Sequence, residues 1–216
     1  MKRPLREILS EMTMQEKVNY IWEYYKYFIL GSIIVLILII YTVYSVVNKK
    51  DDILNIVLMT QYADPEQVEL IKDTLYQELL TDEERDSSNI IIQTIRPNKD
   101  GKDIQGGMEM QKMVAELSAG YIDFFIADHD FFEQMNKDQQ LMAYQNLEGI
   151  STIPFPDDRL LYGEEEAITG IDVTTEPLFQ NLFIEEGQKI ICTPSNAKNT
   201  AYISRLIQFL GEKENK

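Results

Sequence analysis

The sequence is poor in the residues on which many enzymes and metal proteins depend. It has one cysteine, Cys192, and one histidine, His129. A single cysteine excludes an intramolecular disulfide, and no cysteine lies near the apolar N-terminal stretch to carry a lipid anchor. The motifs of α/β-hydrolases, P-loop proteins, dinucleotide-binding proteins and zinc proteases are absent from the sequence. We therefore expect a protein that is not an enzyme and that needs no cofactor and no metal.

Basic residues are also scarce, and they are unevenly distributed. The chain of 216 residues carries 20 Lys and Arg against 36 Asp and Glu, a formal net charge of −16. Residues 1–50 hold seven basic and four acidic residues, whereas residues 51–216 hold thirteen and thirty-two, a net charge of −19. Nucleic acid and anionic lipid repel such an acidic segment. We expect no nucleic-acid partner, and we expect the acidic part to approach a membrane only through a protein partner or cations.

Charge is wholly missing from one stretch, the twenty residues Phe28–Val47. As an α-helix with 1.5 Å of rise per residue, this stretch is roughly 30 Å long, the thickness of the bilayer hydrocarbon. A buried core helix, the alternative, would rarely be this long without a polar face. Side chains that prefer the headgroup level flank the stretch: Trp22, Tyr24, Tyr25, Lys26, Tyr44 and Lys49. The sequence therefore predicts a transmembrane helix over residues 28–47 in a lipid bilayer.

The flanks of this helix also predict its topology. The apolar run is longer than that of a cleaved signal peptide, and no small-x-small site follows Val47, so we expect an uncleaved signal anchor. Five basic residues precede the run, and only Lys49 and Lys50 follow it closely. The positive-inside rule then favours a cytoplasmic N terminus and an extracytoplasmic C-terminal domain at the cell membrane.

Residues 1–27 form the predicted cytoplasmic tail. Thr13 followed by Glu16 fits a capping box, which predicts a helix from Met14 into the membrane. Before it, four apolar residues have the spacing of one helical face: Leu5, Ile8, Leu9 and Met12. They indicate either an interfacial or partner-binding amphipathic helix or a loosely ordered tail.

After a charged hinge at residues 48–52, strands and helices alternate. Strand patterns occur at 53–59, 89–95, 122–127 and 188–192, and helix patterns at 65–80, 104–119, 131–142 and 199–210. Residues 144–188, which contain much of the Gly and Pro, interrupt this order as an insertion. The alternation is typical of βαβ units, so we expect one α/β domain over residues 53–211, with a mostly parallel sheet, and a short tail at 212–216.

Two stretches give this order a family resemblance. SAGYIDFFIADHDFFEQM at 118–135 is similar to the G-x-x-D-hydrophobic-D turn of the type 2 periplasmic solute-binding fold, and KIICTPSNAKNTAYISRLIQFL at 189–210 resembles its returning strand and helix. The N-terminal part looks like small membrane-anchored proteins of Gram-positive bacteria. The resemblance implies a solute-binding-like lobe in reduced form. Only residues 144–188 are available for the second lobe, which in this family has on the order of a hundred residues. This shortage favours a partner-binding role.

In open α/β sheets, ligands bind beyond the carboxyl ends of the strands. The residues after the predicted strands that we take as candidate ligand contacts are Tyr62, Arg96, Asp128, Ser195 and Asn196. Arg96 can clamp a carboxylate and Tyr62 can stack on a ligand. The alternative is that these residues form turns and helix caps. We interpret His129, between two aspartates, as part of a capping turn and not as a metal ligand.

These observations lead to three hypotheses. The first is a non-enzymatic accessory module, a subunit of a membrane transporter or envelope assembly with a membrane-protein partner. The second is a tethered binding protein for a small ligand, an anionic solute if Arg96 contacts it. The third is an envelope enzyme of an unrecognised kind.

Overall fold

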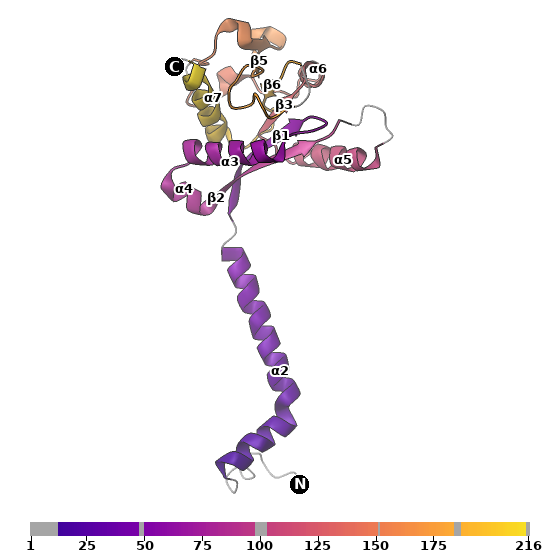
Figure 1. The fold of residues 1–216 in the computed structure, drawn as a ribbon, viewed down its shortest axis with the longest axis vertical. Coiled ribbons are helices and arrows are strands. Elements are labelled where there is room, and N and C mark those ends of the chain that lie inside the picture. Colours follow the sequence, from indigo (N-terminus) through magenta and orange to yellow (C-terminus); the bar gives the residue numbers. More distant parts are fainter. Residues whose placement is uncertain (1–12, 48–49, 98–102, 151, 184–186, 215–216) are drawn as a thin grey trace. The chain divides into compact units, whose positions relative to one another are not determined.

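The computed structural model describes residues 13–47, 50–97, 103–150, 152–183 and 187–214 (Figure 1). The chain forms two separate compact units, Met1–Lys49 and Lys50–Lys216. Two of the sequence predictions, the apolar face of Leu5–Met12 and the interfacial Lys49, lie outside the described residues.

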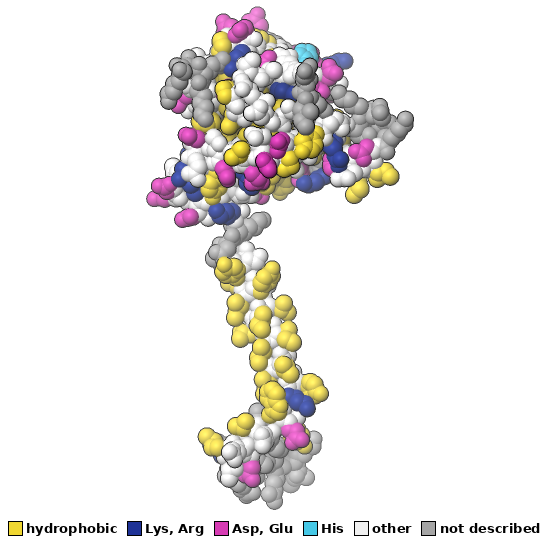
Figure 2. All heavy atoms as spheres, in the orientation of Figure 1, with side chains coloured by type: hydrophobic (Ala, Val, Ile, Leu, Met, Phe, Trp, Pro, Cys, Tyr) yellow, Lys and Arg dark blue, Asp and Glu magenta, His cyan; other side chains and the backbone are white. Residues whose placement is uncertain are grey.

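The described part of the first unit is a single helix, α2 (Met14–Val47). Its start is the predicted capping box: the Thr13 N–H donates to Glu16 Oε2 at 2.8 Å, and the Glu16 N–H donates to Thr13 Oγ1 at 3.5 Å. Within α2, the window Trp22–Ser45 has 24 residues and a mean hydropathy of 2.5, and none of it is buried by the described chain. Figure 2 shows hydrophobic side chains along the visible face of this helix. By length and composition, α2 is able to cross a membrane.

The second unit is built on a six-stranded mixed sheet in the order β2-β1-β3-β6-β5-β4. The strands are β1 (Asp51–Met59), β2 (Ser88–Ile95), β3 (Phe124–Ala127), β4 (Leu160–Tyr162), β5 (Ile168–Asp172) and β6 (Ile190–Cys192). β1 is parallel to β2 and to β3, as expected. The pairs β3–β6, β5–β6 and β4–β5 are antiparallel, which corrects the expectation of a mostly parallel sheet. Parallel neighbours need a long crossover, and β4 and β5 are joined by only a short turn.

In the described residues of the second unit, five α-helices accompany the sheet. They are α3 (Pro65–Leu79), α4 (Asp82–Ser87), α5 (Ile104–Ser118), α6 (His129–Lys137) and α7 (Thr200–Glu214), accompanied by the 3₁₀ turns η1 (Tyr144–Asn146), η2 (Asp157–Arg159) and η3 (Glu164–Glu166). The sequence did not predict α4. α6 begins two residues earlier than predicted because Asp128 caps it, its Oδ1 accepting the Phe131 N–H at 3.0 Å.

The sheet has a hydrophobic core on each face. On one face, Leu54 and Ile56 of β1 belong to a cluster with Leu75 of α3 and Leu206 of α7. On the other face, Val57 of β1 belongs to a second cluster, with Met113 of α5 and with Phe132 and Met135 of α6. Helices on both faces agree with the α/β prediction.

Residues 144–188, expected as an inserted, reduced second lobe, belong to the same sheet and core. They supply β4 and β5 at one end of the sheet. They also bury Tyr144, Phe155, Val173 and Phe179 in the first of the two clusters. The segment therefore extends the main body of the domain.

Candidate functional site

The sheet topology divides the five predicted ligand contacts between two edges of the sheet, which lie at opposite ends of its strands. Tyr62, Arg96 and Asp128 follow β1, β2 and β3, which are parallel, so these residues lie at one edge. β6 is antiparallel to β3, and its last residue, Cys192, pairs with Phe125 near the start of β3. Ser195 and Asn196 therefore follow β6 at the opposite edge. The structure does not bring the five residues into one site.

At the first edge, the guanidinium of Arg96 already holds a carboxylate of this chain. Arg96 Nη2 lies 2.8 Å from Glu109 Oε1, and Nε donates to Glu109 Oε2 at 3.3 Å. The hydrogen bond from Arg96 lowers the pKa of Glu109 below its ordinary value. The two-pronged contact fastens the end of β2 to α5, so a ligand carboxylate at Arg96 would have to displace Glu109.

The other predicted residues make hydrogen bonds within the domain or lie at its surface. Asp128 caps α6, and the side chain of Tyr62 is half exposed. The Ser195 N–H donates to the carbonyl of Gln140 at 2.8 Å. Asn196 Nδ2 donates to the carbonyl of Leu117, in the last turn of α5, at 2.7 Å. Asn196 thus satisfies a helix-end carbonyl that has no partner within the helix.

A buried carboxylate that sequence reasoning missed lies near this second edge. Asp123 is 1% exposed, and its Oδ2 accepts the Asn55 N–H at 2.8 Å and Asn199 Nδ2 at 3.1 Å. Burial raises the pKa of the Asp123 carboxyl above its ordinary value. These bonds connect β1, the segment before β3 and the start of α7. Asp123 therefore holds these three segments of the domain together.

A cleft of about 520 Å³ lies elsewhere, at the end of the sheet formed by β4 and β5. It is lined by Pro156, Asp158, Arg159, Asp172, Thr174, Thr175 and Gln188. These residues come from η2, from the end of β5 with the turn after it, and from the segment before β6. All of the lining residues lie within residues 144–188, the segment predicted as an insertion.

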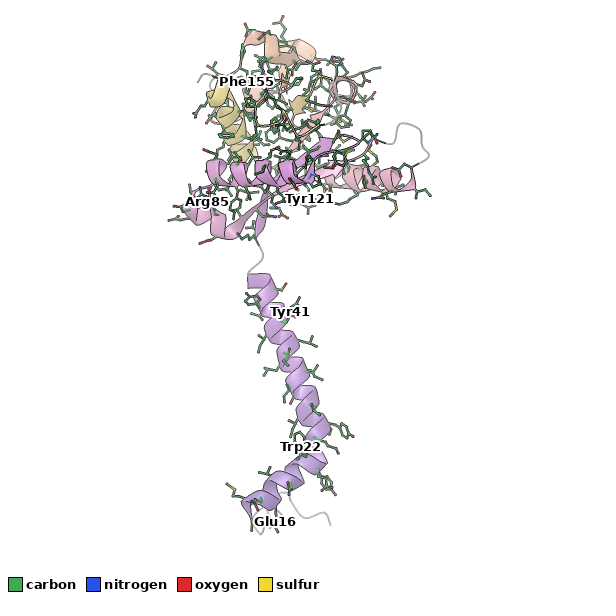
Figure 3. All side chains as sticks on the ribbon, in the orientation of Figure 1. Glu16, Trp22, Tyr41, Arg85, Tyr121 and Phe155 are labelled. Atoms are coloured by element: carbon green, nitrogen blue, oxygen red, sulfur yellow. The ribbon has the colours of Figure 1, made fainter. Side chains whose placement is uncertain are left out.

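Arg159 lies in one wall of this cleft, where several contacts hold its side chain in place. Its Nε donates to the Asp172 carbonyl at 2.7 Å, and its Nη2 lies 3.6 Å from Glu176 Oε2. The side chains of Arg159 and Glu176 are 12% and 1% exposed. The guanidinium also lies 5.1 Å from the ring centroid of Phe155, which is labelled in Figure 3. An arginine held by a carbonyl, a carboxylate and a ring has little freedom to move.

Asp172 links the other parts of the cleft. Its Oδ1 accepts the Thr174 N–H at 2.8 Å, and its Oδ2 accepts Gln188 Nε2 at 2.7 Å. Thr174 Oγ1 in turn accepts the Lys189 N–H at 2.8 Å. The turn after β5 and the segment before β6 are thereby joined by hydrogen bonds, and the walls are formed before any ligand arrives.

The cleft has a polar and mildly acidic lining. The charge of Arg159 is balanced by Glu176, and the lining also carries the carboxylates of Asp158 and Asp172. Hydroxyl and amide groups from two threonines and one glutamine complete it. Such a surface can hydrogen-bond a hydroxyl-rich or cationic molecule, whereas an anion would meet uncompensated negative charge.

No metal centre is found in the part of the chain that the structure describes. No group of three or more His, Cys, Asp and Glu residues there is arranged to hold an ion. His129 Nε2 lies 3.8 Å from Glu133, one turn further along α6.

Comparisons of the chain with protein-family models, with curated proteins and with solved structures find no match.

Proposed function

We propose that this protein is a single-pass membrane-anchored accessory module. In this proposal α2 crosses the cell membrane with its N terminus in the cytoplasm, and residues 50–216 form an extracytoplasmic domain that binds a transporter or envelope protein. The observation that carries the proposal is the window Trp22–Ser45, a predominantly apolar stretch of 24 residues that the described chain does not bury. An apolar helix of this length without protein cover is stable in hydrocarbon and costly in water.

The polar groups of α2 fit this role. Ser32 Oγ donates to the Ile29 carbonyl at 2.9 Å, and Thr42 Oγ1 donates to the Leu38 carbonyl at 2.8 Å. Both hydroxyls are thus satisfied within the helix, as a lipid environment requires. Aromatic side chains and Lys26 lie at the N-terminal end of the window, the arrangement of a membrane interface.

Apolar side chains on the surface of the domain support a protein partner. On α5, Ile104 is 82% exposed, Met108 is 67% exposed and Val114 is 53% exposed. Large apolar side chains that gather on one exposed helix are typical of protein–protein contacts. The reduced solute-binding-like architecture belongs to the same proposal, and the βαβ order of β1, β2 and β3 supports it.

The test is affinity purification of the full-length protein from gently solubilised native membranes. We expect one membrane protein to copurify in a fixed stoichiometric ratio. The double variant Ile104→Lys, Met108→Lys should lose it, whereas the matched control Leu70→Lys, at a 58% exposed position of α3, should retain it. Recovery of the wild-type protein without a stoichiometric membrane partner would overturn the accessory role.

The cleft around Arg159 favours a second candidate function, a tethered binding protein for a small ligand. Its preformed walls and acidic lining fit a hydroxyl-rich or cationic ligand. Thermal-shift screening of the full-length protein with neutral polyols and sugars, organic cations and organic anions tests this function. We expect stabilisation by one of the first two classes, which Asp158→Asn abolishes and the control Asp157→Asn preserves. Stabilisation by anions alone, or by no class, would count against it.

A further inference from the structure

The helix α2 is longer than a membrane span requires. Its 34 residues extend over roughly 51 Å at 1.5 Å per residue, whereas the hydrocarbon needs only about 20 residues. The apolar window begins at Trp22, so the residues from Met14 onward add about two turns before it. These turns are helical by their own means, because the Thr13 and Glu16 capping box starts them.

The added turns have one apolar face. Met14, Val18 and Trp22 follow one another at intervals of four residues and are 79%, 66% and 57% exposed. At 3.6 residues per turn these positions form one stripe, and the polar Glu23 lies about 140° around the helix from the middle of this stripe. No described part of the chain covers the stripe.

The stripe is continuous with the surface that the proposed span exposes to lipid. It reaches Trp22, the first residue of the apolar window, and Trp is enriched at the headgroup level of membranes. Figures 1 and 3 show that α2 bends near Trp22. Because of this bend, the first turns of α2 can point in a different direction from the span. An amphipathic helix beside a bilayer lies in its interface with the apolar face towards the acyl chains.

The charges on these turns also suit a lipid surface. Between Met14 and Tyr27 the helix carries two lysines, Lys17 and Lys26, and two glutamates, Glu16 and Glu23. The balanced charge gives neither strong attraction to nor strong repulsion from an anionic headgroup layer. Apolar contact therefore dominates, and binding should depend little on the lipid charge.

We infer that the first turns of α2 form an interfacial helix that lies on the cytoplasmic leaflet, with Met14, Val18 and Trp22 at the boundary of headgroups and acyl chains. The inference rests on the proposed membrane span of α2. It adds a second membrane contact that fixes the depth and rotation of the anchor, and its ligand is the lipid surface.

Single introduced cysteines in the full-length protein test this contact. The native Cys192 is fully buried, and burial raises the pKa of its thiol, so an added thiol reacts selectively. Met14→Cys and Val18→Cys probe the stripe, and Glu23→Cys is the matched control on the opposite side. Each variant is labelled with an environment-sensitive dye and reconstituted in vesicles of phosphatidylcholine and phosphatidylglycerol.

We expect the dyes at positions 14 and 18 to shift to shorter emission wavelengths and to be quenched by nitroxide lipids. The dye at the control position, 23, should be quenched by iodide in the water. Because Trp22 is the one tryptophan of the sequence, its quenching by brominated lipids is a label-free check of the same depth. The pattern should be similar in vesicles of phosphatidylcholine alone.

Two other patterns would overturn the inference. Equal iodide quenching at all three positions would mean that the first turns project into water. Shifted emission without lipid quenching would mean that protein covers the stripe. Carbonate extraction of the same vesicles separates this failure from failure of the proposed span: protein that resists extraction keeps the span, and released protein refutes the span together with the inference.

Discussion

The two units of this chain use the same side chains in opposite ways. In α2, Ile37 and Ile40 each expose 59% of their surface, whereas Ile190 and Ile191 in β6 expose none. The domain obtains its stability by burying apolar groups among its own residues. α2 has no such partners in the described chain, and by length and composition it is able to cross a membrane. What differs between α2 and the domain is whether the chain itself buries the hydrophobic side chains.

The strongest test of this comparison between α2 and the domain is a mutation that leaves a cavity in the domain core. Leu206 of α7 is fully buried between the helix and the sheet. Leu206→Ala should lower the free energy of unfolding of the domain by about 2–5 kcal/mol, because it removes apolar contacts and leaves a cavity. The measurement is urea unfolding followed by circular dichroism of the full-length protein in micelles. Leu36→Ala, at a 57% exposed position in α2, is the control and should leave the domain transition unchanged.

The reciprocal test places a charge in the anchor. Ile37→Asp should disfavour membrane insertion by about 3 kcal/mol, since a carboxylate near the middle of a span must leave water. We expect a larger fraction of the variant in the carbonate extract, with an unchanged melting transition of the domain. Ile37→Val is the matched control. Equal retention of all three proteins would refute the assignment of lipid as the environment of α2.

A smaller effect is expected at an ion pair between helices of the domain. Arg205 Nη1 lies 2.9 Å from Glu84 Oε2, and the hydrogen bond from Arg205, together with the Thr81 N–H, lowers the pKa of Glu84 to about 2. The folded protein therefore binds a proton at the Glu84 carboxyl less tightly than the unfolded chain does. The ion pair contributes fully to the stability of the domain above pH 4.5, the ordinary pKa of the group, and this contribution is lost as the pH falls towards about 2.

Because the pair is partly exposed, Glu84→Gln should cost about 1 kcal/mol at pH 7. The cost should disappear near pH 2, which urea unfolding over a pH series measures. Glu83→Gln, the exposed neighbour in the same turn, is the control and should change stability by only a few tenths of a kcal/mol. A cost for Glu84→Gln that is independent of pH would contradict the ion-pair interpretation.

The smallest effect expected has the opposite dependence on pH. Burial raises the pKa of Asp123, so the folded protein holds this proton more tightly than the unfolded chain. The contribution of Asp123 to stability is full below the ordinary value of 3.8 and falls as the pH rises through the folded pKa. Asp123→Asn removes this titration, so its stability relative to wild type should improve from pH 4 to pH 7. A flat or falling difference would contradict the effect of burial.

The fold was predictable where the signals were local. Twenty uncharged residues and the Thr13 and Glu16 capping box sufficed for α2, and apolar runs sufficed for β1 to β3. α4 was missed because its six residues, DEERDS, bury no side chain, although Thr81 and Glu84 form a capping box that could have revealed it. The direction of β6 was missed because three residues, Ile190–Cys192, carry no signal for the neighbour with which they pair.

The candidate site was harder to predict for the same reason. Arg96 looked available because its partner, Glu109, lies on the next helix. In the sequence, no motif connects Arg159 with Asp172 or Glu176. Only the antiparallel pairing of β4 and β5 brings these segments together. The anchor depends on composition, whereas the cleft depends on tertiary contacts.

The place of β1 between β2 and β3 also sets the order in which the domain can fold. β1 directly follows the anchor and is made first, but its partner β3 and the covering helix α7 come much later in the chain. Its apolar residues must therefore wait until almost the whole domain has been synthesised, because contacts so distant in sequence form late. During this interval the strand is open to wrong pairings and aggregation.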